Sequence, residues 1–124
     1  MEDPKFDYNT RLDIKFKHLE VINIPKMVEE CTYKWFNQSL TQVNNSVVCL
    51  GIVEGEYHWH KHDSDDEFFF VLEGTLFVDL EDRVIKLNAN EGTTVSKGIL
   101  HRTRAPKKVV MLMVETAEII PTGD

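Results

Sequence analysis

Turn-forming residues recur along most of this chain at short, even intervals, and this rhythm constrains the fold more than any other feature. From about Ser39 onward, short apolar stretches alternate with breaks rich in Gly, Asn, Asp, Glu and Pro. The breaks fall at 44–45, 54–56, 63–66, 73–74, 81–82, 88–92, 98 and 106. A spacing of about 8 to 12 residues between turn signals is typical of an all-β sandwich or barrel. The sequence therefore predicts an antiparallel all-β fold.

The first part of the chain follows a different pattern. Residues 1–18 mix charged and aromatic side chains without a sustained period, which predicts an N-terminal arm that lies against the domain or is partly mobile. Asn23 followed by Pro25 combines a capping residue with an early proline and predicts a short helix. No repeat, linker or low-complexity block divides the rest of the 124 residues, so residues 19–124 are expected to form a single domain.

Charge and hydropathy narrow the classes of partner. The net charge is -7, and the short Lys107–Lys108 pair does not make the basic patch on which nucleic-acid binding normally rests. The longest apolar runs, such as 68–72 and 109–114, are far shorter than the roughly 20 residues that span a bilayer. The acidic N-terminus does not resemble a secretory signal. We therefore expect a cytoplasmic protein with neither nucleic acid nor membrane as partner, and with Cys31 and Cys49 reduced.

Histidines occupy every second position between 57 and 62, namely His58, His60 and His62. In a β-strand such residues share one face. The acidic segment 63–66 is expected to form a loop that returns Glu67 beside these histidines. A lone histidine is usually a satisfied polar residue and an acidic run is usually a solvated turn. Three histidines on one face with a returning carboxylate favour a site for divalent iron, nickel, manganese, cobalt or zinc.

The spacing of these residues resembles the first motif of the cupin superfamily: His60-x-His62, four residues, Glu67, six residues, Gly74. The second motif ends in Gly-x-x-His, which residues 98–101 match. The chain therefore looks like a small, single-domain protein of the cupin-2 type. The resemblance implies a jelly-roll barrel, or antiparallel double-stranded β-helix, with one divalent metal ion on His60, His62, Glu67 and His101.

The sequence departs from the family pattern outside these four residues. The leading glycine of the first motif is displaced by one position to Gly55, and Ser96 replaces the usual proline of the second motif. Strand alternation predicts that Arg102 and Arg104 face outward while Phe69 faces inward with Glu67. We therefore expect a largely apolar pocket beside the metal that suits a phosphorylated sugar poorly.

Two functions follow from the resemblance. The first is a small-molecule enzyme of the oxygenase, isomerase or lyase type, in which His58 lines the pocket as a proton shuttle. The second is a binding or sensor module without a reaction, and the metal can also serve only to brace the barrel. His58 can equally be a buried histidine bonded to a neighbouring strand. The last strand is apolar on both faces, Met111 and Met113 opposite Val110 and Leu112, and with the resemblance this favours a homodimer.

Overall fold

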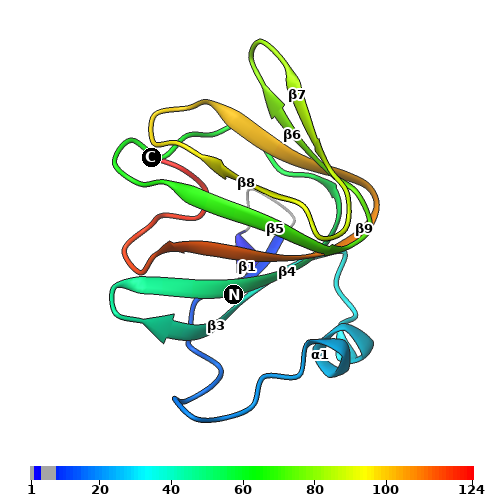
Figure 1. Cartoon of the computed structure of the whole chain (residues 1–124), viewed down its shortest axis with the longest axis vertical. Helices are drawn as coiled ribbons and strands as arrows, with labels where there is room; N and C mark the ends of the chain where they lie inside the picture. The colour runs from blue at the N-terminus through cyan, green and yellow to red at the C-terminus, as the bar shows by residue number, and fades with distance from the viewer. Residues whose placement is uncertain (1, 4–7) are drawn as a thin grey trace.

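β-Strands are the main secondary structure, and one short helix accompanies them in the computed structural model, which describes residues 2–3 and 8–124 (Figure 1). The elements in chain order are β1 (Glu2–Asp3), β2 (Tyr8–Arg11), α1 (Ile24–Glu30), β3 (Trp35–Val43), β4 (Ser46–Glu56), β5 (Glu67–Glu73), β6 (Leu76–Leu80), β7 (Val84–Leu87), β8 (Gly92–Val95) and β9 (His101–Thr116). The predicted mostly-β fold with a short helix is confirmed. No helix within 2–3 and 8–124 has the length and apolar character needed to cross a membrane.

The helix α1 begins where the sequence predicted it. The side chain of Asn23 caps it by accepting a hydrogen bond from the backbone N–H of Lys26 at 3.1 Å, and Pro25 lies in its first turn. Met27 is its buried residue and packs in a cluster with side chains of β3, β4 and β9: Phe36, Leu40, Leu50, Ile52 and Val110. The helix therefore covers one face of the sheet, beside β3 and β4.

The long strand β9 organises the sheet. Its second half lies between β4 and β5, with Val114 opposite both Val48 and Phe68, and its first half pairs with β6. The strand order is β1-β2-β3-β4-β9-β5-β8, and β6 pairs with both β7 and β9. All pairs are antiparallel except β2 with β3. A single strand thus carries His101 at its start and Glu115 near its end.

The two faces of the sheet pack into separate clusters because successive side chains of a strand point to opposite sides. One face packs under α1. The other holds the larger cluster, which includes Trp35, Cys49, Val53, Phe69 and Met111. As predicted, Phe69 is buried with Glu67, and Thr103 and Ala105 are buried while Arg102 and Arg104 are half-buried on the opposite face. Cys31 and Cys49 are both free.

Part of the expected N-terminal arm belongs to the sheet. Residues 8–11 form β2, which pairs in parallel with β3, and Tyr8 is buried with its ring stacked on Tyr57 at 4.2 Å between centroids. Pairing with a distant segment leaves no trace in local periodicity, so the sequence pattern gave no sign of this strand. The boundary between arm and domain stays a prediction, and residues 1 and 4–7 of the arm lie outside the described residues.

The expected strand over residues 57–62 is wrong. The strand β4 ends at Glu56, its pairing with β9 shifts register between Val53 and Gly55, and Gly55 has a φ of 118°. A backbone in this region is accessible mainly to glycine, and the irregularity turns the chain out of the ladder. Only His60 returns to the sheet, as an isolated bridge with His101. The three histidines therefore do not share one strand face.

Candidate metal centre

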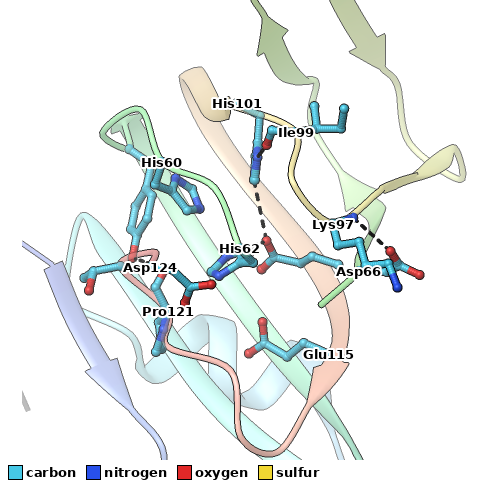
Figure 2. A network of polar contacts seen from close by, with 12 residues as sticks. His60, His62, Asp66, Lys97, Ile99, His101, Glu115, Pro121 and Asp124 are labelled. Atoms are coloured by element: carbon cyan, nitrogen blue, oxygen red, sulfur yellow. Dashed lines mark hydrogen bonds and ion pairs between the residues drawn. The ribbon is translucent and has the colours of Figure 1, made fainter. Parts of the chain in front are cut away.

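The four side chains predicted as metal ligands are buried and lie close together. His60 and His62 follow β4, Glu67 opens β5 and His101 opens β9, and their exposed fractions are 8%, 2%, 7% and 1%. The backbone N–H groups of His60 and His101 donate to each other's carbonyl oxygens, both at 2.9 Å, which fixes these residues side by side. Figure 2 shows the labelled histidines around one central space, with the dashed line running from His101 to Glu67.

Distances between ligand atoms define the centre. One ligand atom each of His60, Glu67 and His101 can be chosen so that all three lie within 4.8 Å of one another. The Nε2 atoms of His62 and His101 lie 3.5 Å and 3.6 Å from Oε1 of Glu67. The His60 ring lies 5.0 Å from that of His62, centroid to centroid. The structure thus brings together all four residues, while their role as metal ligands stays a prediction.

Backbone carbonyls set the tautomers of two of these histidines. Nδ1 of His60 lies 3.0 Å from the carbonyl oxygen of His58, and Nδ1 of His101 lies 2.9 Å from that of Ile99. A carbonyl oxygen only accepts hydrogen bonds, so both Nδ1 atoms carry a proton. In the neutral rings Nε2 therefore keeps its lone pair, which is the arrangement of a metal-binding imidazole.

The polar atoms at the centre lack partners. Both ring nitrogens of His62, Nε2 of His101 and Oε1 of Glu67 are buried without a hydrogen-bond partner among the described residues. Leaving a buried polar group unsatisfied costs about 1–3 kcal/mol. A divalent cation would satisfy imidazole lone pairs and a carboxylate oxygen together, so these residues fit a divalent metal ion.

The ionisation of these groups also suits a cation. Burial lowers the pKa of His60 to about 4, because it disfavours the charged imidazolium. Burial opposes ionisation of Glu67, but hydrogen bonds from the facing imidazoles of His101 and His62 outweigh it and lower the pKa of this carboxyl to about 2. These bonds require an N–H on the facing ring nitrogen, a proton that a bound cation would displace. Near neutral pH the centre therefore presents a neutral imidazole of His60 beside a carboxylate.

Residues 48–115 match the family of cupin domains. This chain belongs to the cupin family. The uncharacterized protein YdbB of Bacillus subtilis (strain 168) is 40% identical over 94 residues, which are 75% of this chain and 83% of that relative. A solved cupin-2 domain containing protein from Shewanella frigidimarina NCIMB 400 is 32% identical with a TM-score of 0.74, covering 77% of this chain and 94% of that one.

A third comparison supports the fold alone. The solved protein NMB1881 from Neisseria meningitidis has 24% identity and a TM-score of 0.69, covering 78% of this chain and 99% of that one. The cupin fold is therefore shared well beyond close sequence similarity. Because one fold hosts many chemistries, the activity of this cupin has to be argued from its own residues.

Glu115 of this cupin also lines the cavity beside the centre, and the sequence analysis missed it. Figure 2 shows it on the same side of the sheet as the labelled histidines. Burial, and then the charge of Glu67, raise the pKa of Glu115 to about 9, so it is protonated at neutral pH. Its Oε1 accepts a hydrogen bond from Sγ of Cys49 at 3.4 Å. The alternation Met111, Met113, Glu115 along β9 was the signal that could have revealed it.

His58 occupies a different place from the other histidines of the cupin. Its Nε2 donates to the carbonyl oxygen of Thr122 at 2.6 Å, and Nδ1 then accepts from the hydroxyl of Tyr8 at 3.2 Å. With both ring nitrogens engaged, this geometry favours the alternative of a histidine bonded to neighbouring segments. The proton-shuttle role stays a prediction. The backbone carbonyl of His58 contributes in another way, since it orients His60.

The two motif segments of the cupin are tied together behind the centre. The carboxylate of Asp66 accepts a hydrogen bond from the backbone N–H of Lys97 at 2.9 Å, drawn dashed in Figure 2. Gly98 follows with a φ of 80°, a conformation that favours glycine, and its N–H donates to the carbonyl oxygen of His62 at 2.8 Å. The turn therefore forms around Ser96 although the family's proline is absent, and it leads directly to His101.

The C-terminal residues close one side of this centre. The carbonyl oxygen of Pro121 accepts from the hydroxyl of Tyr57 at 3.1 Å, and the N–H of Asp124 donates to the carbonyl oxygen of Lys61 at 2.9 Å. A Cβ placed on Gly123 would lie 2.7 Å from Cβ of His60. The tail therefore packs directly against the segment that carries His60.

A cavity of about 40 Å³ adjoins the centre. Phe69, Met111 and Met113 give it apolar walls, as predicted, but polar residues of β3 and the carboxyl groups of Glu67 and Glu115 also line it. Arg102 and Arg104 point elsewhere, and both donate to the carboxylate of Asp79. The cavity is therefore less apolar than predicted.

Proposed function

We propose that this cupin binds one divalent metal ion on His60, His62, Glu67 and His101, and uses it in a reaction on a small molecule. The observation that carries the proposal is the set of buried, unpartnered nitrogen and oxygen atoms beside a cavity. Buried polar atoms normally have partners, and these four side chains have the chemistry of a site for iron, nickel, manganese, cobalt or zinc. The reaction class is that of an oxygenase, isomerase or lyase.

When bound, such an ion supplies Lewis-acid catalysis or, if it is iron, oxygen chemistry. The residues of the chain provide the surroundings of the reaction. Phe69, Met111 and Met113 give the cavity apolar walls against which the carbon skeleton of a bound molecule can pack. The protonated carboxyl of Glu115 can donate a hydrogen bond or a proton to a molecule held there, and Glu67 remains ionised beside it.

Elemental analysis of protein purified without added metal tests the site. We expect about one divalent ion per chain in the wild type and a large loss in Glu67→Ala. Asp65→Ala is the matched control, because this carboxylate belongs to the loop before β5. Asp66→Ala removes the bond to the N–H of Lys97 and should still lose less metal than Glu67→Ala. Retention of the ion by Glu67→Ala, or equal losses in all three variants, would contradict the assignment.

A binding or sensor module without a reaction is the second candidate. The small volume of the cavity, about 40 Å³, favours it over an oxygenase, because a ligand that fills such a space leaves little room for dioxygen. Turnover of any substrate by the metal-loaded protein would exclude this candidate. A metal that only braces the fold is excluded if a chelator leaves the melting temperature unchanged.

We further infer that the sheet closes into a jelly-roll barrel and that the protein is a cytoplasmic homodimer that binds neither nucleic acid nor membrane. Family membership and the cavity on one face of the sheet support the barrel. Half-buried apolar side chains on the other face support a dimer, and they include Phe68, Phe70, Leu72 and Leu112. A molar mass of one chain in light scattering would contradict the proposal of a homodimer.

A further inference from the structure

Two polar atoms remain unpartnered away from the four predicted ligands. They are the indole Nε1 of Trp35 and the amide Oδ1 of Asn37, both buried without a hydrogen-bond partner among the described residues. Trp35 is only 4% exposed. The N–H group of a buried tryptophan usually has a hydrogen-bond partner, so the indole N–H of Trp35 needs an acceptor that the described residues do not supply.

Both residues line the cavity of the metal centre. They stand two positions apart on β3 and therefore share a face of that strand. The Trp35 ring stacks on Tyr57 at 5.5 Å between centroids, and Tyr57 in turn meets His60 edge-on at 5.1 Å. Asn37 pairs with Gly51 of the neighbouring strand β4, and its Oδ1 and the side chain of Met111 both border the space above Gly51. The pair thus forms one wall of the cavity.

Gly51 makes the space in front of this wall. A Cβ added there would lie 2.9 Å from Cε of Met111 and 3.2 Å from Oδ1 of Asn37. The absence of a side chain at this position keeps the amide in contact with the cavity. Apolar residues in place of Trp35 and Asn37 would suit an empty interior better, because unsatisfied polar atoms destabilise a fold. Their polarity is accounted for if a bound molecule completes their hydrogen bonds.

The donors and charges of the cavity restrict that molecule. The indole N–H only donates a hydrogen bond and the amide oxygen only accepts one. Arg11 is the one cationic residue among the described residues of the lining, and its guanidinium is engaged with Asn9 and Tyr33. An anionic group would instead meet the ionised carboxylate of Glu67. Neutral oxygen groups therefore suit this wall, and phosphate or carboxylate groups do not.

We propose that Trp35 and Asn37 recognise the ligand of this site, a compact, uncharged hydroxycarbonyl compound whose carbonyl oxygen accepts from Trp35 and whose hydroxyl group donates to Asn37. The inference rests on the proposed function, because the opposite end of the same molecule faces the metal centre. Water fills the positions of the ligand until it binds.

Calorimetric titration of the 124-residue protein as purified tests the proposal with three probes. Dihydroxyacetone offers both a carbonyl and hydroxyl groups, acetone lacks the hydroxyl donor, and dihydroxyacetone phosphate adds an anionic group. We expect the wild type to bind dihydroxyacetone more tightly than the other two. Trp35→Phe and Asn37→Leu should each weaken dihydroxyacetone binding about tenfold, the effect of one lost hydrogen bond in a buried site.

Control measurements separate recognition from folding. Trp59→Phe makes the same change at an exposed tryptophan, whose ring lies under the guanidinium of Arg102. This variant should bind dihydroxyacetone as tightly as the wild type. Trp35→Phe and Asn37→Leu should keep the metal content and the cooperative thermal unfolding of the wild type, although Trp35→Phe should lower the melting temperature somewhat because it removes buried ring volume. In Asn37→Leu, acetone and dihydroxyacetone should bind equally.

Three results would overturn the proposal. They are failure of the wild type to bind dihydroxyacetone, equal or tighter binding of its phosphate, and unchanged affinity in both Trp35→Phe and Asn37→Leu. Loss of metal content or of cooperative unfolding in both variants would also assign these residues to folding instead of recognition. Failure of the proposed function can be told apart from failure of this proposal. The first appears as wild-type protein that contains no metal, whereas the results named above concern ligand binding and folding.

Discussion

Replacing Glu115 by Gln should remove a pH dependence from the stability of the metal-free protein. Burial and the nearby Glu67 raise the pKa of the folded Glu115 to about 9 from 4.5. A folded-state pKa above the unfolded value stabilises the protein at low pH, and this contribution is lost as pH rises through the folded pKa. Glutamine keeps the shape of the protonated acid and does not titrate.

The size of the effect follows from the two pKa values. Each pH unit between them changes the free energy of unfolding by about 1.36 kcal/mol. Below pH 6.5 His60 has the opposite effect on stability. Burial lowers its pKa from 6.5 to about 4, so the unfolded chain binds a proton at His60 before the folded protein does, and stability is lost as pH falls. From about pH 6.5 to 8 the contribution of Glu115 stands alone, and the wild type should lose about 2 kcal/mol.

Urea unfolding of chelator-treated protein at several pH values between 6.5 and 8 measures this loss. Glu115→Gln should give a nearly constant free energy of unfolding across the range. Glu118 is exposed and lies just beyond the end of β9, so Glu118→Gln should show the same pH dependence of the free energy of unfolding as the wild type. Parallel profiles for the wild type and Glu115→Gln would refute the reasoning, because the proton would then not reside on this carboxyl.

Two further substitutions test the contacts around the centre. His58→Gln should retain metal by elemental analysis, because the carbonyl of residue 58 still orients His60. It should speed amide hydrogen exchange at residues 122–124, since the bond to Thr122 is weakened. Loss of the metal would place His58 among the ligands. Gly123→Ala should destabilise the protein by about 1–3 kcal/mol in urea unfolding, because a Cβ at a φ of 99° would lie 2.7 Å from His60. If Gly123→Ala were as stable as the wild type, Gly123 would not be in close contact with His60.

The sequence was most informative where the chemistry depends on spacing along the chain. His60, His62 and Glu67 lie within a few residues of one another, so one loop suffices to bring them together. His101 could be added only through the resemblance to cupins, since no local pattern links it to His60. Asn23 and Pro25 predicted the start of α1 because capping is a local interaction.

Features that depend on distant pairing were missed. The strand β2 gains its hydrogen bonds from β3 and has no sequence pattern of its own. Residues 57–62 look like a strand, but the irregularity at Gly55 ends β4 first. Trp35, Asn37 and Glu115 are polar residues within ordinary β-strand alternation, and only the assembled sheet turns them toward one cavity.

The carbonyl groups that hold His60 and His101 in place have a consequence for how this site tolerates change. Each imidazole is oriented by the main chain two residues before it, at His58 and at Ile99. A main-chain oxygen is present whatever side chain the position carries. The orientation of these two rings therefore does not depend on the side chains at positions 58 and 99, and the exposed Ile99 in particular can change while the geometry of the centre stays the same.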